Sequence, residues 1–335
     1  MTLRVAINGY GRIGRNVLRA WFEAGTPPEL EFVAINDLGK AEALAHLTRY
    51  DSTHGRFGLP VELRGDEMHI AGKRLRLFSE PRPELLSWAA LDVDVVLECT
   101  GQFRARHDAA RHLAAGARRV IIGAAPFDSV DATVVYGVNH QSLDARHLII
   151  SSVSCTTHAL VPLVKILHEA YGIESGLMTE IHAVTSDQVV LDHTHRDLRR
   201  GRAAGHNIIP TTSSSIGALK RVLPEMADRI DGYSIRVPTL NVAAVDFNFV
   251  AERPLTVAGI NSLFRGMAAG DYREILGYCE EMLVSSDFNH SPYSLIFDAT
   301  ETRVVGRQAK VLVWYDNEWG YAHRLLDLCS YLSKG

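Results

Sequence analysis

The sequence predicts two domains, an α/β domain with a doubly wound, mostly parallel sheet and then an α+β domain with a mostly antiparallel sheet. Three observations predict this arrangement. A glycine-rich turn separates a strand pattern from a helix pattern near the N-terminus, strands and helices then alternate up to residue 153, and from about residue 177 the strands are longer and the helices fewer. The 335 residues suffice for two hydrophobic cores.

The composition argues against several classes of protein. With 47% hydrophobic residues, 22% charged residues and a net charge of −4, the chain is typical of a globular protein and gives no reason to expect nucleic acid or an anionic membrane as partner. It has no run of about 18 apolar residues, so we expect no membrane span. A strand pattern begins at once and leaves no room for a signal peptide, and the four cysteines lack CxxC spacing. We therefore expect reduced thiols and a cytoplasmic location.

The first strand, residues 3–7, leads into the turn Gly9-Tyr10-Gly11-Arg12-Ile13-Gly14, and a helix with an apolar face at Ile13, Val17, Ala20 and Trp21 follows. This order of strand, GxGxxG and helix is typical of a Rossmann dinucleotide-binding domain. Gly9 permits the tight turn, Gly11 lets a pyrophosphate approach the backbone, and Gly14 lets helix and strand pack closely.

The second strand, residues 31–35, ends at Asn36-Asp37, 23 residues beyond Gly14. A carboxylate at this place is positioned to accept hydrogen bonds from a ribose, and its charge repels a 2′-phosphate, which favours NAD. The alternative interpretation is an ordinary glycine turn with a capping Asp. Further strands are predicted at 93–97, 119–122, 133–136 and 148–150. Because ligands bind at the carboxyl ends of such strands, Thr100 becomes a further candidate for cofactor binding.

Cys155 lies between the predicted strand 147–150 and a predicted helix over 159–171. Unpaired N–H groups and partial positive charge at a helix N-terminus stabilise a thiolate, which is the nucleophilic form of cysteine. The alternative is a small buried apolar residue. The flanking hydroxyl side chains do not suit an apolar core, so we expect a catalytic cysteine close to the cofactor.

The second half contains predicted strands at 177–184, 232–237, 243–250 and 309–315. The first includes His182, a candidate base because an imidazole commonly activates a cysteine nucleophile. Spacing alone does not show that these two side chains meet, and a structural histidine is the alternative. His193 and His195 lack further ligands, so we predict no metal site.

Six segments together carry a resemblance to a known family: 6–15, 50–55, 154–157, 207–210, 236–239 and 314–321. Over almost its whole length the chain resembles phosphorylating glyceraldehyde-3-phosphate dehydrogenases. The erythrose-4-phosphate dehydrogenases, which are close relatives, share nearly all these segments. The resemblance implies residues 1–153 as the NAD-binding Rossmann domain, joined by a C-terminal helix over 317–335, and residues 154–316 as the catalytic domain.

The resemblance also implies a role for each matching residue. Cys155 is the nucleophile and His182 its base; the aldehyde forms a thiohemiacetal, hydride transfer to NAD leaves a thioester, and inorganic phosphate releases 1,3-bisphosphoglycerate. The substrate's own phosphate is bound by Thr185 and Arg236. The attacking phosphate is bound by Ser154, Thr156, Arg202 and Ser213, and Ser214 beside them is a further candidate. The cofactor contacts are Arg12, Ile13, Asp37 and Asn317, of which Asn317 orients the nicotinamide carboxamide.

The resemblance further implies a homotetramer acting in glycolysis or gluconeogenesis, in which the loop 199–210 lines a neighbour's cofactor site. The chain departs from the family's usual residues near the nucleophile, at Ser152, Val153, His158 and Ala159. It also has Ser214 where the family has Gly, which could crowd the attacking-phosphate pocket. These changes keep open an erythrose-4-phosphate dehydrogenase and a non-catalytic nucleotide-binding paralogue, although Thr185 favours the triose. His193-Thr194 resembles enzymes that also accept NADP.

Overall fold

The computed structural model describes residues 2–334, which divide into two compact units. One unit ends at Val153 and is joined by the residues from Ala322 onward; the other runs from Ser154 to Tyr321. The last helix, α7 (Trp319–Ser333), begins two residues later than 317, and residues 317–321 belong to the second unit. No helix in this described part of the chain is both long and apolar enough to cross a membrane.

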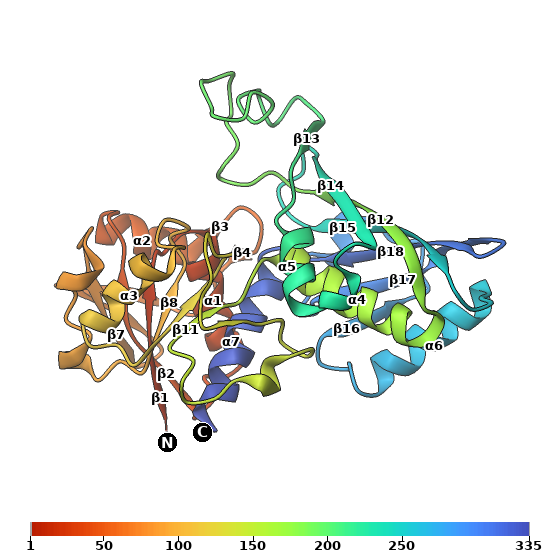
Figure 1. The fold of residues 1–335 in the computed structure, drawn as a ribbon. Helices are drawn as coiled ribbons and strands as arrows, with labels where there is room; N and C mark the ends of the chain where they lie inside the picture. The colour runs from red at the N-terminus through yellow and green to blue at the C-terminus, as the bar shows by residue number, and fades with distance from the viewer. Residues whose placement is uncertain (1, 335) are drawn as a thin grey trace. The chain divides into compact units, whose positions relative to one another are not determined.

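The first unit is built on a nine-stranded sheet with the order β10-β11-β9-β8-β1-β2-β7-β6-β5. Figure 1 labels β1, β2, β7, β8 and β11 of this sheet. Its strands are β1 (Leu3–Asn8), β2 (Leu30–Asn36), β5 (Val61–Arg64), β6 (Glu67–Ile70), β7 (Lys73–Phe78), β8 (Val95–Glu98), β9 (Arg119–Ile122), β10 (Ala132–Thr133) and β11 (Ile149–Ser151). All neighbours are parallel except the pairs β5–β6 and β6–β7. The order β7-β2-β1-β8-β9-β11 reverses between β1 and β8, which confirms the predicted Rossmann fold.

Helices and short elements complete this unit. They are α1 (Arg12–Glu23), α2 (Ala41–Arg49), α3 (Arg106–Ala114) and the short strands β3 (Tyr50–Asp51) and β4 (Gly55–Arg56), with 3₁₀ turns at Pro83–Leu85, Ala89–Leu91 and His140–Ser142. The predicted strand over 133–136 was wrong beyond Thr133. The Asn139 side chain accepts from the Val135 N–H at 2.8 Å, and this local bond turns the chain away from the sheet.

The second unit is built on a seven-stranded sheet with the order β13-β14-β12-β15-β18-β17-β16. Its strands are β12 (Ile173–His182), β13 (Ile209–Thr211), β14 (Ile230–Arg236), β15 (Ala243–Ala251), β16 (Leu276–Cys279), β17 (Leu295–Val305) and β18 (Gln308–Tyr315). Only β12–β14 and β16–β17 are parallel, which confirms the mostly antiparallel α+β domain.

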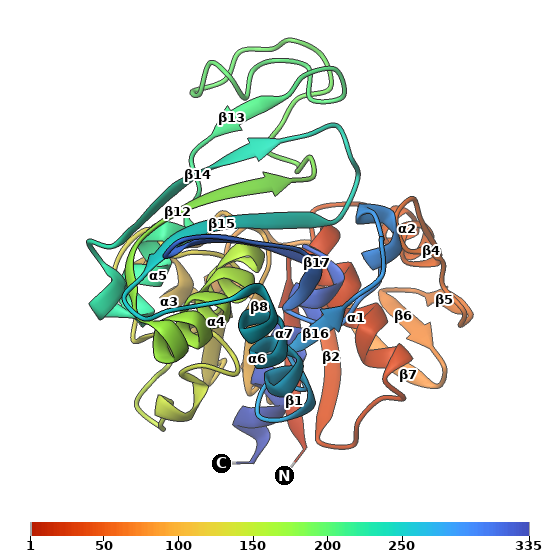
Figure 2. The same ribbon diagram turned by 90° about the vertical axis from the view of Figure 1, so that its right-hand side faces the viewer.

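Helices cover one face of this second sheet. They are α4 (Cys155–Tyr171), α5 (Ser215–Val222) and α6 (Val257–Ala269), with 3₁₀ turns at Pro224–Met226 and Ser285–Phe288. Figure 2 shows α4 and α6 on the same side of the sheet. Along β12 the side chains alternate, so that Met178, Glu180 and His182 are buried while Leu177 is exposed on the opposite face. The sheet therefore presents an acid and an imidazole on its helix-covered side.

Candidate active site

Cys155 is the first residue of α4, four residues earlier than the predicted start of the helix at 159. Ser154 is the N-cap, and its hydroxyl accepts from the Thr157 N–H at 3.2 Å. Val153 just before it is buried with φ +46, a left-handed conformation that is strained for a β-branched residue. The strained turn at Val153 and the cap at Ser154 thus fix where the thiol side chain begins.

The structure brings the two predicted catalytic residues together. The Sγ atom of Cys155 lies 3.6 Å from Nε2 of His182, the last residue of β12. On the other side of the ring, Nδ1 lies 2.7 Å from the Ala183 carbonyl oxygen. The donor Nη1 of Arg236 lies 3.1 Å from the same Nδ1, but the carbonyl oxygen is closer and can only accept. We therefore assign the proton to Nδ1, which leaves Nε2 as an acceptor facing the thiol. This is the tautomer that a general base needs.

Both members of the pair are held in their neutral forms. Burial raises the pKa of the Cys155 thiol to about 12, with the Glu180 carboxylate acting in the same direction. Burial, followed by the positive charge of Arg236, lowers the pKa of His182. The helix N-terminus was expected to favour a thiolate, but at this half-buried position the loss of water outweighs it. His182 Nε2, 3.6 Å from the thiol, is positioned to accept its proton.

Arg236 lies beside this pair because its strand runs parallel to β12. It is the last residue of β14, and the sheet register places it directly opposite His182. Its Nη1 is 3.1 Å from His182 Nδ1, and its Nε is buried without a hydrogen-bond partner among residues 2–334. A guanidinium with an unused donor is suited to an anion such as phosphate.

Two other predicted phosphate residues lie in the exposed loop that follows β12. Arg202 forms an ion pair with Asp192, with 2.8 Å between Nε and Oδ2. Thr185 lies in a turn in which its N–H donates to the Gln188 side chain at 3.3 Å. As the loop stands, Asp192 engages the Nε of Arg202 and Gln188 engages the backbone N–H of Thr185. Sequence matching found their positions along the chain but not these local bonds.

The predicted hydroxyl ligands are already largely used by the protein. Ser154 caps α4, and the Thr156 hydroxyl is buried in bonds to other side chains of the same unit. The Ser213 hydroxyl lies 2.6 Å from that of Ser215, while Ser214 is exposed at the start of α5 and makes no capping bond. At the start of α4, backbone N–H groups rather than hydroxyls are what remains for an anion.

His158, the most conspicuous departure near the nucleophile, has a structural role in this arrangement. It is buried in the first turn of α4, its Nδ1 lies 3.2 Å from the Ser154 carbonyl oxygen, and its ring packs edge-on against Tyr321. The carbonyl requires Nδ1 to donate. His158 therefore stabilises the beginning of the helix that carries Cys155.

The glycine turn of the first unit fits a dinucleotide. A Cβ on Gly9, which has φ +90, would lie 2.6 Å from the Thr100 nitrogen, and a Cβ on Gly14 would lie 2.2 Å from the Gly9 carbonyl oxygen. A Cβ on Gly11 would meet no atom within 4 Å. Gly9 and Gly14 are thus required by packing, whereas Gly11 leaves open space at the N-terminus of α1 for a phosphate.

The other predicted cofactor residues of this unit flank the turn. Asp37 follows β2, and its carboxylate accepts from the Tyr10 N–H at 2.7 Å and the Gly39 N–H at 2.8 Å, so the side chain is held in one orientation. Arg12 is bound to the buried carboxylate of Asp51, with Nη2 3.1 Å from Oδ1. Ile13 is half-buried on the first turn of α1.

A buried polar network supports Thr100 and was missed by the sequence analysis. The buried carboxylate of Glu98 accepts from the Thr100 N–H at 2.8 Å and from its hydroxyl, and from Asn8 Nδ2 at 2.5 Å. His112 Nε2 lies 3.1 Å from the same carboxylate, and Trp88 donates to His112 Nδ1 at 3.0 Å. The network holds the carboxyl ends of β1 and β8 next to the glycine turn. The sequence signal for this network was Glu98, a charged residue inside the otherwise apolar strand pattern of β8.

Asn317, the last predicted cofactor residue, lies in the second unit. It is buried, and its Oδ1 has no hydrogen-bond partner among the described residues. The neighbouring Asp316 accepts from the Glu318 N–H at 2.9 Å and the Trp319 N–H at 2.7 Å, which fixes this segment at the start of α7. An unsatisfied amide oxygen on a fixed segment is suited to a ligand's N–H group.

Comparisons with known proteins agree with this geometry. Residues 3–106 match the family model "Glyceraldehyde 3-phosphate dehydrogenase, NAD binding domain", and residues 154–317 match "Glyceraldehyde 3-phosphate dehydrogenase, C-terminal domain". The chain belongs to the glyceraldehyde-3-phosphate dehydrogenase family. It is 52% identical over 327 residues to a plasmid-encoded and to a chromosomal glyceraldehyde-3-phosphate dehydrogenase of Cupriavidus necator, with 98% of this chain and 97% of each relative covered.

Membership of the glyceraldehyde-3-phosphate dehydrogenase family confirms the resemblance inferred from the motifs. It identifies the chain as an NAD-dependent oxidoreductase that acts on an aldehyde group. The NAD-binding match covers the glycine turn, Asp37 and Thr100, which are the residues whose shape and polarity fit the cofactor.

Proposed function

We propose that this chain oxidises glyceraldehyde 3-phosphate to 1,3-bisphosphoglycerate with NAD and inorganic phosphate, through a thioester on Cys155. The observation that carries the proposal is the 3.6 Å approach of the Cys155 thiol to an unprotonated His182 Nε2, beside the unused donor of Arg236. A nucleophile, a base and an anion-binding group are thus present in one place. The family membership supports the same substrate.

The proposed reaction begins with transfer of the thiol proton to His182 as Sγ attacks the aldehyde carbon. The protonated His182 returns that proton to the former carbonyl oxygen, which completes the thiohemiacetal. Bound NAD supplies the acceptor for the hydride of the oxidation step. His182 takes the hydroxyl proton in that step, leaving a thioester, and general-base help of this kind is worth about 10²–10⁴-fold. Inorganic phosphate then attacks the thioester carbon and releases the acyl phosphate and the Cys155 thiolate, which recovers its proton from His182.

We assign the substrate's phosphate to Arg236 and Thr185. The attacking phosphate is assigned to Ser154, Thr156, Arg202, Ser213 and Ser214. For Arg202 this requires exchange of its exposed ion pair with Asp192, which costs little because such pairs contribute only about 0–1 kcal/mol. For Thr156 the backbone N–H is the group offered, since the hydroxyl is buried.

Erythrose 4-phosphate is the second candidate substrate, and the exposed Ser214 hydroxyl is the observation that favours it. A side chain in place of the family's glycine narrows the attacking-phosphate pocket, and water could then replace phosphate. A non-catalytic paralogue is not favoured, because the Cys155–His182 contact is intact.

Purified protein is to be assayed for NAD reduction with each aldehyde, with and without inorganic phosphate, beside the variant Cys155→Ala. We expect phosphate-dependent activity that prefers the triose, and no turnover by the variant. Preference for erythrose 4-phosphate, or indifference to phosphate, supports the second candidate. Turnover by Cys155→Ala contradicts the thioester mechanism, and repeating the assay with NADP measures cofactor preference.

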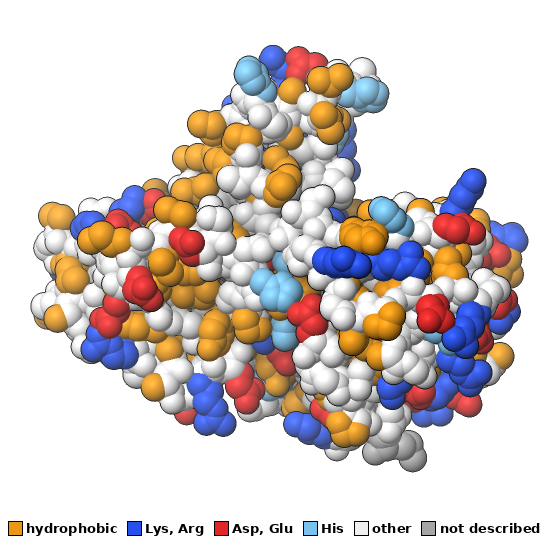
Figure 3. All heavy atoms as spheres, turned by 180° about the vertical axis from the view of Figure 1, so that it is seen from behind, with side chains coloured by type: hydrophobic (Ala, Val, Ile, Leu, Met, Phe, Trp, Pro, Cys, Tyr) orange, Lys and Arg blue, Asp and Glu red, His pale blue; other side chains and the backbone are white. Residues whose placement is uncertain are grey.

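We further propose a homotetramer in the cytoplasm, where reducing conditions keep a catalytic thiol free. Strongly exposed apolar side chains support assembly: Val190, Leu191, Leu198 and Ile208 are 71–87% exposed on the loop that follows β12. Figure 3 shows apolar side chains gathered on this projecting loop.

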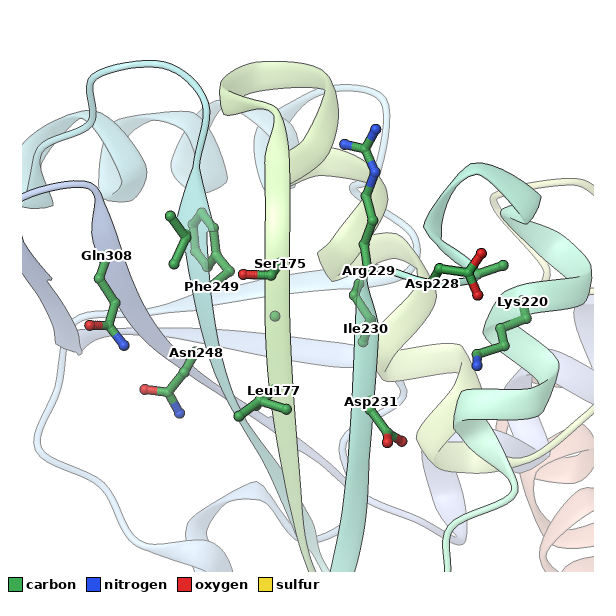
Figure 4. A pocket seen from close by; sticks show the side chains of 13 residues that line it. Ser175, Leu177, Lys220, Asp228, Arg229, Ile230, Asp231, Asn248, Phe249 and Gln308 are labelled. Carbon is green, nitrogen blue, oxygen red and sulfur yellow. The ribbon is translucent and has the colours of Figure 1, made fainter.

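A second surface feature is a hollow of about 540 Å³ on the uncovered face of the second sheet. It lies over β12, β14 and β15, beside the exposed Leu177 (Figure 4). Sedimentation of the purified chain measures its size.

A further inference from the structure

Glu180 is a buried carboxylate next to the catalytic pair to which neither the motifs nor the family comparison assigns a role. It lies two residues before His182 on β12, so both side chains point to the helix-covered face of the sheet. Only 2% of Glu180 is exposed. Its Oε1 lies 3.9 Å from His182 Nε2, the atom that also faces the Cys155 thiol.

One oxygen of this carboxylate anchors the residue that follows the nucleophile. The Thr156 hydroxyl donates to Glu180 Oε1 at 2.8 Å, and the Tyr315 hydroxyl lies 2.8 Å from the Thr156 oxygen. Thr156 has a single hydroxyl proton, which it gives to Glu180, so Tyr315 must donate to Thr156. The chain of bonds thus runs from β18 through the start of α4 to β12 and ends on Glu180.

The other oxygen is left unsatisfied. Glu180 Oε2 is buried and has no hydrogen-bond partner among the described residues. A buried carboxylate with so few hydrogen bonds is costly unless a positive charge lies close by. His182 becomes such a charge when it is protonated, because its Nε2 lies 3.9 Å from Glu180 Oε1.

The charged and titratable groups around the pair act in opposite directions. Arg236 faces His182 from β14 and disfavours its protonation, whereas Glu180 and Glu318 favour it. At the thiol, Glu180 disfavours the thiolate and Arg236 favours it. The Tyr315 hydroxyl also faces Glu180 and Cys155, but burial raises its pKa far above neutrality, so it stays uncharged.

We propose that Glu180 is a positioning residue of the catalytic pair, acting on Cys155 and His182 through charge and on the start of α4 through Thr156. It keeps the thiol protonated until a substrate arrives, and it stabilises His182 after that residue has taken a proton. This inference rests on the proposed roles of Cys155 and His182.

Alkylation of Cys155 by iodoacetamide tests, without any turnover, whether Glu180 keeps the thiol protonated. The variant Glu180→Gln keeps the shape and the oxygen that accepts from Thr156 but removes the charge. We expect it to be alkylated roughly tenfold faster than the wild type at pH 7, since one pKa unit of the thiol changes the thiolate fraction tenfold. The matched control Glu174→Gln removes an exposed charge from the far end of the same strand and leaves the rate within about twofold.

A rate for Glu180→Gln within about twofold of the wild type, or below it, overturns the proposal. The variant Cys155→Ala measures the background alkylation of the other cysteines. If Glu180→Gln fails to fold, Glu180→Thr, which also removes the charge, takes its place, and the same alkylation rates support or overturn the proposal. A thiol that responds as expected in a protein with no aldehyde oxidation would contradict the proposed function but not the influence of Glu180 on Cys155.

The pH profile of kcat tests whether Glu180 stabilises His182 in its protonated form. Without the Glu180 charge His182 is harder to protonate, so the acid limb of kcat is expected to move to lower pH while KM for the aldehyde changes little. A purely structural role would lower kcat without moving the limb, and that result also overturns the proposal.

Discussion

At the scale of single residues, the chemistry of the site depends on which atoms carry protons. The Ala183 carbonyl sets the tautomer of His182, burial keeps the Cys155 thiol protonated, and Arg236 retains a free donor beside them. Each of these side chains is an ordinary residue type. What sets their protonation states is the removal of water and the position of one neighbouring group.

The unused donor of Arg236 predicts a specific loss of phosphate recognition. Because hydrogen bonds to a charged group are worth about 1.5–3 kcal/mol, Arg236→Lys should lower kcat/KM for glyceraldehyde 3-phosphate by roughly 10- to 100-fold. Steady-state kinetics with glyceraldehyde, which lacks the phosphate, provide the control. An equal loss on both aldehydes would show that Arg236 does not bind the substrate's phosphate.

The raised pKa of Cys155 predicts how stability changes in alkaline solution. Between the ordinary cysteine pKa and about 12, the unfolded chain has lost the thiol proton while the folded protein retains it. Folding stability from this residue is therefore present at neutral pH and is lost as pH rises, by at most about 1.4 kcal/mol per pH unit. Denaturation by urea at pH 7, 8.5 and 10 measures the loss, and Cys155→Ala should show a smaller one. If the free energy of unfolding falls equally with pH in wild type and Cys155→Ala, the loss of stability does not come from Cys155.

At the scale of elements, the sites are built where a strand ends and a helix begins. The turn Gly9–Gly14 joins β1 to α1, and the strained Val153 and the capping Ser154 lead from β11 into α4. Both junctions present backbone N–H groups at a helix N-terminus. The second junction has a serine cap and carries the nucleophile Cys155 at the first helical position, whereas the first has a glycine cap, Gly11, which leaves space for a phosphate.

The two glycines of the first junction predict separable effects. Gly14→Ala would force a Cβ against the Gly9 carbonyl and should lower the free energy of unfolding by several kcal/mol. Gly11→Ala has open space and an ordinary φ of −73, so it should fold with a change below about 1 kcal/mol yet bind NAD more weakly. Chemical denaturation and calorimetric titration with NAD measure the two quantities. Normal NAD binding by Gly11→Ala would refute the role given to this glycine.

At the scale of the whole molecule, each unit combines an apolar core with a buried polar network next to its site. In the first unit, Glu98 joins β8 to β1 through Asn8 and to α3 through His112. In the second, Glu180 joins β12 to α4 through Thr156. Such networks hold strand ends in register, because their members lose hydrogen bonds if the ends shift.

Glu98 predicts the contribution of its network to the stability of the first unit. Glu98→Ala would leave Asn8, Thr100 and His112 without their shared acceptor and should cost about 3–5 kcal/mol, whereas Glu98→Gln, which keeps one acceptor oxygen, should cost less. Thermal unfolding followed by tryptophan fluorescence measures the loss, and Trp88, which donates to His112, is one of the four tryptophans that contribute to the signal. Equal melting temperatures for wild type and Glu98→Ala would be incompatible with it.

Both fold classes and the identity of the main chemical groups could be predicted from the order of the residues alone. Periodicity and turn residues are local properties, so the GxGxxG turn, the acid at Asp37 and the strand containing His182 could be located along the chain. Family membership followed from the motifs. The irregular strand near 133–136 was misjudged because a single bond from Asn139 overrode the local pattern.

Which side chains meet became known from the three-dimensional fold. Cys155 and His182 are 27 positions apart, and Glu180, Arg236 and Tyr315 reach the same site through sheet register and the packing of α4 on β12 and β18. Periodicity places a residue on a face but carries no information about what covers that face. The neutral resting state of Cys155, the occupied hydroxyl of Thr156 and the unpaired oxygen of Glu180 all follow from burial, which arises only when distant segments pack together.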